Sequence, residues 1–302
     1  MKTNGDTKKR AGSRRGVAGE DLRGGSDSRP AHYWENKKYH TRYKEERHMK
    51  TISIINLKGG VAKTTSSVNM AHILSAVHKK KVLLVDNDKQ GNASKFFCRH
   101  SYERPGVAEI MTDRNIETAA VIQHTDYEGL DIITANMNLS TANLQVMLDQ
   151  SRPQQTRFKR ALQQVAGQYD FCIIDNAPDI NISTINALVA SDDVLVPITI
   201  DDFSLDGLEE LTDQIENARE ELNPALCFRG CFVTQYDRLN EADQQGEEYL
   251  KVCNKYPLFE THIRRTAKMK PCTFERKPIL IYSSRCGAAQ DYKKLVEEYL
   301  KM

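Results

Sequence analysis

Long apolar runs are absent from this sequence of 302 residues. No stretch approaches the roughly 20 consecutive apolar residues that a membrane-spanning helix needs, so we expect no transmembrane segment. The seven cysteines are an odd number, include no C-x-x-C pair and follow no secretory signal. We therefore expect reduced thiols in a cytoplasmic protein, rather than a disulfide-stabilised or zinc-binding one.

Net charge is also small, at +2, but it is unevenly distributed. Residues 1–48 hold 13 of the 43 Lys and Arg residues and 7 of the 41 Asp and Glu residues. Their net charge is therefore +6, and that of residues 49–302 is −4. Because an acidic body does not attract polyanions as a whole, a DNA site on residues 49–302 would have to be a local basic patch.

Residues 1–48 are rich in Gly, Ser, Lys and Arg and show neither helical nor strand periodicity. We expect a basic, mostly disordered N-terminal extension, followed by one large domain over residues 49–302. The extension is either a native basic arm or an upstream stretch included because the gene was read from too early a start, with Met49 as the true start. It is too short and irregular for a helix-turn-helix domain.

From Met49 onward, apolar runs typical of buried strands alternate with amphipathic runs typical of helices. This alternation predicts an α/β fold of three layers, in which a doubly wound, mostly parallel sheet is flanked by helices. The predicted strands are residues 51–56, 82–86, 130–133, 171–175, 193–197, 228–234 and 279–282. The predicted helices are residues 65–77, 156–165, 205–221, 241–254 and 288–300.

The stretch L-K-G-G-V-A-K-T-T at residues 57–65 lies between a predicted strand and a predicted helix. A glycine-containing turn at a helix N-terminus directs backbone N–H groups toward anionic oxygens, so this stretch is typical of a phosphate-binding loop. In such a loop Lys63 would reach the β- and γ-phosphates, and the Thr64 hydroxyl would coordinate Mg²⁺. The strict motif G-x-x-x-x-G-K-[ST] is absent, because Leu57 and Ala62 occupy its glycine positions.

Three acidic residues follow the ends of predicted strands. Asp86 and Asp88 come at the end of one strand, and side chains two residues apart in an extended chain project to the same face. Asp175 ends another strand. Since ligands bind at the carboxyl ends of parallel strands, we expect these acids and the loop to share one site.

Together these segments resemble the ParA/MinD class of ATPases. The resembling motifs are K-G-G-x-x-K-[ST]-[ST] at residues 58–65 (the deviant Walker A loop), V-L-L-V-D-N-D-K-Q-G-N at 82–92 (Walker A′), F-C-I-I-D at 171–175 (Walker B), D-N-A-P at 175–178 and the run 197–208. The resemblance extends from about Met49 to the C-terminus and implies the P-loop fold of that class.

The resemblance also implies a site for ATP and Mg²⁺. The nucleotide-contacting residues would be Lys58, Gly59, Gly60, Val61, Ala62, Lys63, Thr64, Thr65, Asp86, Thr234 and Gln235. Mg²⁺ would be held by Thr64, Asp86 and Asp175, in the last case usually through water. The GTPase motif N-K-x-D is absent, which favours ATP over GTP. For Thr234 and Gln235, an ordinary loop is the alternative to an adenine contact.

Three residues carry the catalytic roles that the resemblance implies, namely Lys58, Lys63 and Asp88. Lys58 would reach across the interface of an ATP-bound homodimer to the phosphates of the second subunit, much as an arginine finger does. Asp88 would orient or activate the attacking water. For Asp86, anchoring of a strand end is the alternative to support of the phosphate loop and Mg²⁺.

A candidate DNA-binding segment lies near the C-terminus. It holds six basic residues within fourteen positions, which are Arg264, Arg265, Lys268, Lys270, Arg276 and Lys277. ParA proteins place basic residues in the similar region and use them to bind DNA without sequence preference. A solvated run of charges is the alternative interpretation.

The resemblance favours a ParA-type partition ATPase. ATP would drive a homodimer that binds nonspecific DNA on the nucleoid, and a ParB-like protein bound at a centromere would stimulate hydrolysis and release it. A related ATPase that positions a protein cargo is an alternative that the sequence leaves open.

Two other rivals fit the sequence less well. A MinD-like ATPase would bind the membrane through a basic amphipathic helix beyond the fold. Here the last predicted helix, residues 288–300, has apolar residues at core-packing spacing, so we expect no membrane partner. A nitrogenase-reductase-like protein would need two cluster cysteines in glycine-rich surroundings, and only Cys98 and Cys172 lie in the relevant region.

Overall fold

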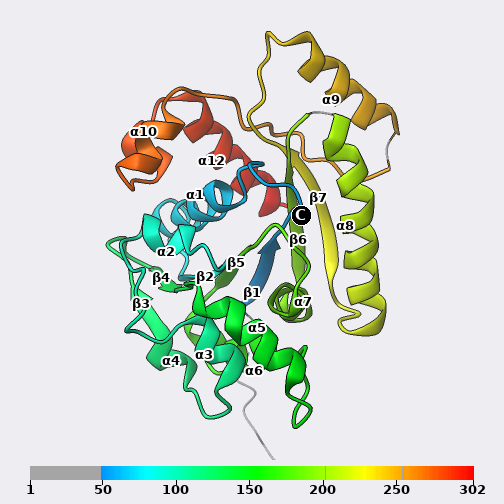
Figure 1. The fold of residues 1–302 in the computed structure, drawn as a ribbon. Coiled ribbons are helices and arrows are strands. Elements are labelled where there is room, and N and C mark those ends of the chain that lie inside the picture. Colours follow the sequence, from blue (N-terminus) through cyan, green and yellow to red (C-terminus); the bar gives the residue numbers. More distant parts are fainter. Residues whose placement is uncertain (1–48, 201, 254) are drawn as a thin grey trace, which may run out of the picture. The chain divides into compact units, whose positions relative to one another are not determined.

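The structure, a computed structural model, describes residues 49–200, 202–253 and 255–302, so the predicted N-terminal extension lies outside it. Within these residues, seven strands form one sheet in the order β3-β4-β2-β5-β1-β6-β7 (Figure 1). The strands are β1 (Lys50–Ile54), β2 (Val82–Asn87), β3 (Ile122–His124), β4 (Leu130–Ile133), β5 (Phe171–Asn176), β6 (Asp193–Ile198) and β7 (Cys227–Val233). Every pairing is parallel except that of β3 with β4.

Helices cover both faces of this sheet, which confirms the predicted three-layer α/β fold (Figure 1). The longer helices are α1 (Lys63–Ala76), α5 (Asn138–Leu148), α6 (Arg157–Gln163), α7 (Ile182–Ala190), α8 (Asp202–Glu221), α9 (Glu241–Cys253) and α12 (Gly287–Tyr299). The shorter ones are α2 (Asn92–Phe96), α3 (Val107–Thr112), α4 (Thr118–Val121), α10 (Met269–Phe274), α11 (Ile279–Tyr282) and a 3₁₀ turn at Ala166–Gln168.

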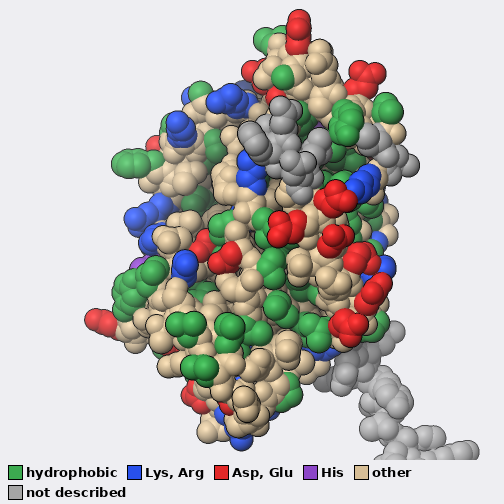
Figure 2. Space-filling view, turned by 45° about the vertical axis from the view of Figure 1, so that its right-hand side comes forward, with side chains coloured by type: hydrophobic (Ala, Val, Ile, Leu, Met, Phe, Trp, Pro, Cys, Tyr) green, Lys and Arg blue, Asp and Glu red, His purple; other side chains and the backbone are tan. Residues whose placement is uncertain are grey.

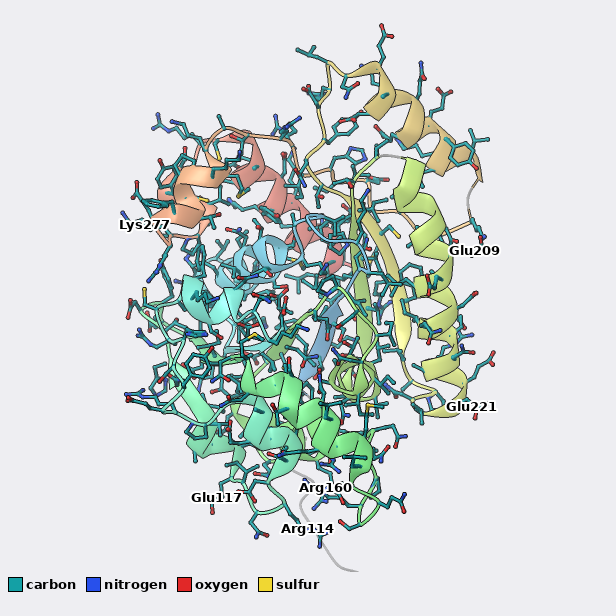
Figure 3. The ribbon with its side chains drawn as sticks, in the orientation of Figure 1. Arg114, Glu117, Arg160, Glu209, Glu221 and Lys277 are labelled. Carbon is teal, nitrogen blue, oxygen red and sulfur yellow. The ribbon has the colours of Figure 1, made fainter. Side chains whose placement is uncertain are left out.

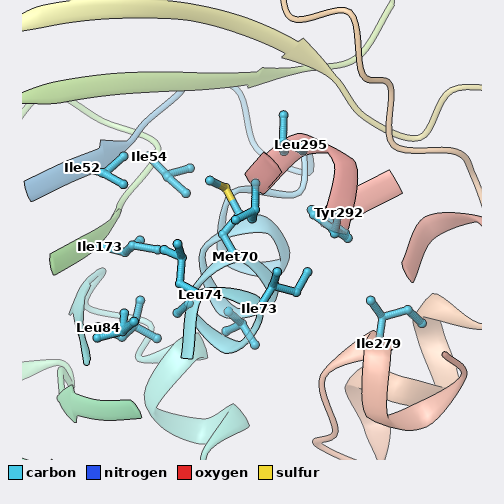
Figure 4. Packing of buried hydrophobic residues seen from close by; sticks show 14 of the residues in the cluster. Ile52, Ile54, Met70, Ile73, Leu74, Leu84, Ile173, Ile279, Tyr292 and Leu295 are labelled. Atoms are coloured by element: carbon cyan, nitrogen blue, oxygen red, sulfur yellow. The ribbon is translucent and has the colours of Figure 1, made fainter. Parts of the chain in front are cut away.

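The central strands are apolar on both sides because both sides are buried. Leu84 of β2 belongs to the core cluster that also contains residues of α1 and α12, whereas its neighbour Leu83 belongs to the cluster with residues of α3, α5 and α6 on the other face. Figure 4 shows the first of these layers, where Met70 and Leu74 of α1 meet Ile173 of β5. A continuous apolar strand is therefore required here, and the side-chain alternation of a strand sends successive residues to opposite layers.

The last helix packs on the body of the domain, as its apolar spacing predicts. Tyr292, Leu295, Val296 and Tyr299 are all at most 5% exposed. Tyr299 Oη donates to Asp193 Oδ2 over 2.7 Å at the beginning of β6. The described residues include no helix that is both long enough and apolar enough to cross a membrane.

One predicted strand is wrong. Residues 279–282, with the apolar run I-L-I-Y, form the short helix α11 instead. Pro278 sets the start of this turn, and the N–H of Ile279 donates to Asn69 Oδ1 of α1 over 2.8 Å. The run is apolar because Ile279 is fully buried against the α1 layer, and burial alone does not distinguish a strand from a helical turn.

Candidate functional site

The loop between β1 and α1 is pinned by Asn56. Its Nδ2 donates to the carbonyl oxygen of Pro197 on β6, and its Oδ1 accepts from the N–H of Lys58, both over 2.8 Å. Gly60 and Ala62 have φ angles of 80° and 66°, in the left-handed region. An alanine there costs about 1–2 kcal/mol relative to right-handed backbone. The chain accepts this strain at Ala62, where the strict phosphate-loop motif has glycine.

The N-terminus of α1 opens into the space above the loop. No side chain caps this helix, and its first turn contains no acidic residue. Its first helical hydrogen bond runs from the N–H of Ser66 to the carbonyl of Ala62 over 2.9 Å. The N–H groups of residues 63–65 therefore precede the helical ladder, and the positive end of the helix dipole favours an anion at this place.

Lys63 points its ammonium group back over the same loop. Nζ donates to the carbonyl oxygen of Lys58 over 2.8 Å, and the residue is 8% exposed. Burial lowers the pKa of Lys63, while the carboxylates of Asp175, Asp88 and Asp179 act in the opposite direction. A buried cation held by one carbonyl can transfer to phosphate oxygens, which offer it stronger, charge-assisted hydrogen bonds.

Asp175 ends β5 beneath the first turn of α1. Its Oδ1 accepts from Ser67 Oγ over 2.9 Å. The nearby hydroxyls of Thr64 and Ser67 favour the ionised carboxylate and so act to lower the pKa of Asp175. Its Oδ2 is buried without a hydrogen-bond partner. Burial raises the pKa of Asp175 to about 6, and nearby Asp88 adds to the rise. A carboxylate oxygen without a donor, next to a threonine hydroxyl, suits a hard cation such as Mg²⁺.

Within the described residues, no three His, Cys, Asp or Glu side chains converge into a metal cluster. A Mg²⁺ ion bound to a nucleotide needs no such cluster, because it takes one or two protein oxygens and completes its shell with phosphates and waters.

Asp86 lies deeper than the sequence predicts. The residue is fully buried and is absent from the walls of the neighbouring cavity. Its Oδ2 accepts from the N–H and the hydroxyl of Ser94 over 2.7 and 2.6 Å. Burial, and then the charge of Asp175, raise the pKa of Asp86 to about 7. This geometry favours support of the site from behind over direct contact with a ligand.

Asp88 faces the cavity that these elements enclose. Its Oδ1 accepts from the N–H of Gln90 over 2.9 Å, which fixes the side chain at the end of β2. The cavity has a volume of about 560 Å³, within the size range of small-molecule sites. Its walls include the predicted residues Gly59, Gly60, Ala62, Lys63, Thr64, Thr65, Asp88, Thr234, Gln235, Arg264, Arg265 and Lys270.

Seven predicted residues are not part of the cavity wall, namely Lys58, Val61, Asp86, Asp175, Lys268, Arg276 and Lys277. Val61 is fully buried, and its carbonyl oxygen accepts from Thr234 Oγ1 over 3.1 Å. Gln235 Nε2 donates to the carbonyl oxygen of Gly60 over 2.7 Å. The segment after β7 therefore holds the phosphate loop directly, whether or not it also contacts a base.

The six basic residues of the C-terminal segment divide into two groups. Arg264 is bound by Asp291, with Nε and Nη2 at 2.8 and 2.7 Å from the two carboxylate oxygens. Lys277 pairs with Glu275 over 2.9 Å, and Arg276 Nη1 donates to Cys98 Sγ over 3.2 Å.

The second group makes no ion pair within the described part of the chain, and it consists of the exposed residues Arg265, Lys268 and Lys270. Figure 2 shows Lys and Arg side chains gathered on the upper left of the molecule, while acidic side chains cover the right. Figure 3 places Lys277 in the first region, and Glu209 and Glu221 of α8 in the second.

Sequence reasoning missed three residues that shape the site. The hydroxyl of Ser67 donates a hydrogen bond to the buried Asp175, and that of Ser94 donates one to the buried Asp86. Tyr292 of α12 lines the cavity, and its hydroxyl lies 3.1 Å from Ser66 Oγ. Ser67 lies one helical turn after Lys63, so its position on α1 was a usable signal, whereas nothing in the sequence places Tyr292 beside a loop more than 200 residues earlier.

Fold and site together define a class of protein: an α/β nucleotide-binding domain with a phosphate loop at the carboxyl edge of its sheet. Comparisons with known proteins narrow this class. Residues 49–228 match a family described as an AAA domain. The chain is 35% identical over 252 residues to the sporulation initiation inhibitor protein Soj of Bacillus subtilis, covering 82% of this chain and 97% of that one.

A second relative is the chromosome partitioning protein ParA of Caulobacter vibrioides, 33% identical over 83% of this chain and 94% of that one. Among solved structures, cobyrinic acid a,c-diamide synthase from Mycobacterium smegmatis, with a bound ATP analogue and magnesium, superimposes with a TM-score of 0.73. It is 26% identical and covers 84% of this chain and 95% of that one. The chain belongs to the ParA/Soj family of partition ATPases.

Proposed function

We propose that this protein is a Mg²⁺-dependent ATPase that dimerises on binding ATP, binds DNA without sequence preference and drives DNA partition with a ParB-like partner. One observation carries the proposal: a single cavity is lined by the phosphate loop, by Asp88 and by three basic residues of the C-terminal segment, Arg264, Arg265 and Lys270. The proposed nucleotide site and these basic residues therefore line the same cavity, so a bound nucleotide can change how the basic residues are presented to DNA.

The described residues fit the nucleotide and its metal. The first-turn amides of α1 and the ammonium of Lys63 would hold the phosphates. The Thr64 hydroxyl and the unpartnered Oδ2 of Asp175 would hold Mg²⁺, in the latter case directly or through water. The ion would neutralise charge that develops on the phosphates during transfer.

Asp88 would orient the attacking water, because it lies in the cavity wall near Lys63 and is fixed by the N–H of Gln90. Lys58 would contribute from the second subunit of the dimer to the same phosphates. Thr234 and Gln235 would border the base, since they line the far side of the phosphate loop. The protein would act in the cytoplasm, on DNA of the nucleoid.

The test uses the purified full chain. ATP with Mg²⁺ should produce slow phosphate release and binding to two DNA duplexes of unrelated sequence, whereas ADP should not. The Asp88→Ala variant should bind both nucleotides and DNA but release little phosphate. Equal DNA binding in ATP, ADP and no nucleotide would overturn the proposed switch, and turnover in Asp88→Ala at the wild-type rate would remove Asp88 from the mechanism.

Cargo positioning is a second candidate of the same fold, and it would use the same ATP-dependent engine. The partner that stimulates phosphate release separates the two candidates, because a partition ATPase should respond to a centromere-bound ParB-like protein and a cargo-positioning ATPase to a protein bound to its cargo.

A further inference from the structure

Helix α5 has an unusual composition for a helix at the surface. Its eleven residues, N-L-S-T-A-N-L-Q-V-M-L, include no charged side chain. The helices α8, α9 and α12 all carry several charges on their exposed sides. Solubility normally favours charge on such positions, so its absence from α5 calls for an explanation.

The helix has two apolar faces. Leu139, Ala142 and Val146 are buried against the sheet layer. A second set is exposed to solvent and comprises Met137 (48%), Leu144 (64%), Met147 (61%) and Leu148 (82%). At 3.6 residues per turn, Met137, Leu144 and Leu148 lie within about 40° of one another, opposite the buried set, with Met147 beside them.

Leu144, Met147 and Leu148 are neighbours at a spacing of three or four residues, and Met137 lies two turns earlier on the same side, so these four side chains are named the α5 apolar face. Figure 2 shows hydrophobic side chains gathered on the lower left of the molecule, on the side where α5 lies. Contiguous apolar surface without charge is typical of the centre of a protein interface, where methionine is enriched and charged residues are depleted.

The beginning of α5 is joined to the candidate nucleotide site. Asp86 Oδ2 accepts from Ser94 Oγ over 2.6 Å, and Ser94 Oγ accepts from the N–H of Ala135 over 2.9 Å. The next residue, Asn136, accepts from the N–H of Asn138 over 2.9 Å at the start of the helix. A side chain at Gly91 would meet the carbonyl oxygen of Ala135 at 2.6 Å, so the two segments are in close contact.

We infer that the α5 apolar face binds a second copy of this chain when ATP is bound. The inference rests on the proposed ATP-driven dimer and extends its interface beyond the phosphate loop. A two-fold axis apposes each surface with its own copy, so charged residues near the axis repel themselves, and an uncharged stripe suits this geometry. The stripe is also continuous with the carboxyl edge of the sheet, where Lys58 would cross to the second subunit.

The test compares two full-length variants in a nonhydrolysable ATP analogue with Mg²⁺. Leu144→Glu combined with Leu148→Glu places carboxylates on the α5 apolar face. Leu239→Glu is the matched control, because Leu239 is 92% exposed and lies between β7 and α9. Light scattering after gel filtration should show dimers for wild type and control, and a dimer dissociation constant at least about tenfold higher for the double variant.

Two further measurements distinguish a variant that does not fold from a variant that folds but does not dimerise. Fluorescent nucleotide should bind all three proteins equally, which shows that the double variant is folded. A benzophenone amino acid at position 148 should crosslink one chain to another only with the ATP analogue, and the same probe at position 239 should not.

An intact dimer in the double variant, or no crosslink from position 148, would overturn the inference. So would a double variant that dimerises normally but loses stimulation by a centromere-binding protein, because the face would then belong to that partner. A wild type that stays monomeric in the ATP analogue would instead overturn the proposed dimerisation step itself, and the inference with it.

Discussion

Asp86 and Asp175 are direct neighbours in the sheet, paired across the parallel strands β2 and β5. Both residues are fully buried. Burial is the main cause that raises the pKa of Asp86 to about 7 and that of Asp175 to about 6, and Asp175 also raises that of Asp86. Two adjacent buried carboxylates disfavour full ionisation, and a divalent cation nearby relieves that cost.

The first prediction concerns pH. Because the folded-state pKa values of these two acids exceed the ordinary aspartate value of 3.8, the native state binds more protons than the unfolded state between about pH 4 and pH 7. Their contribution to stability is therefore fully present below about pH 4 and is lost as pH rises through about 6 to 7. Thermal melts from pH 5 to pH 8 should show this loss without nucleotide and a smaller one with ATP and Mg²⁺.

Asp86→Asn provides the control for that prediction. The amide cannot ionise, so the melting temperature of the nucleotide-free variant should fall less than that of wild type over the same pH range. An identical pH slope in the two proteins would show that Asp86 does not titrate there.

The second prediction separates the two lysines of the phosphate loop. Lys63→Ala removes a buried ammonium that charge-assisted bonds would place on the phosphates, so ATP affinity should fall by about 1.5–3 kcal/mol, roughly 10- to 150-fold. Lys58→Ala should retain ATP binding by the monomer but lose ATP-dependent dimerisation and phosphate release. Nucleotide fluorescence, light scattering and phosphate release measure the three properties, and a normal Lys58→Ala dimer with normal turnover would contradict a role across the interface.

The sequence predicts the central part of the fold well, because long apolar strands and the phosphate loop are local patterns. Six of the seven predicted strands are present, with ends that differ from the predicted ones by at most two residues. The edge strand β3 has three residues, I-Q-H, of which none is fully buried, so it carries no periodic signal. Helix α5 lacks the charged face that normally reveals an amphipathic helix, since its outer side carries Leu144, Met147 and Leu148 beside uncharged polar residues.

The site is predictable only as far as its motifs extend. Lys63, Thr64 and Asp88, which come from two separate motifs, line the same cavity. The pairing of Arg264 with Asp291 joins residues 27 positions apart through the packing of α12, and no local pattern reveals it. A count of basic residues therefore overstates the charge available for DNA in this segment.

The third prediction concerns the attachment of α12. Asp193, which is 1% exposed, accepts from Tyr299 Oη over 2.7 Å and pairs with Lys50 and Arg229 over 3.0 and 2.9 Å. Tyr299→Phe removes one hydrogen bond to a charged group, so the free energy of unfolding should fall by about 1.5–3 kcal/mol in urea titrations. Tyr102→Phe, at a position 59% exposed, should change it by less than about 0.5 kcal/mol. Equal effects of the two substitutions would show that the Asp193 cluster does not anchor the helix.

The fourth prediction concerns DNA binding by Arg265, Lys268 and Lys270. If each contacts one phosphate, an ATP-bound dimer neutralises about six, and the slope of log affinity against log salt should be about −5. Affinity should vary little among DNA sequences, since phosphate contacts carry no base information.

Replacing Arg265 and Lys268 by Glu should weaken binding to every duplex and reduce the slope to about −2, because about four of those contacts are lost. The matched control is Arg114→Glu with Arg160→Glu, which changes the charge equally at the opposite end of the domain from Lys277 (Figure 3). Gel-shift titrations across salt in saturating ATP should leave the control slope near −5.

A chain that begins at Met49 shows in the same assay whether residues 1–48 add DNA contacts of their own, since the loss of such contacts would also make the slope less steep. If the Arg265 and Lys268 double variant had the affinity and slope of wild type, these residues would not contact DNA. ATP-driven dimerisation of that variant would show that its nucleotide site is intact.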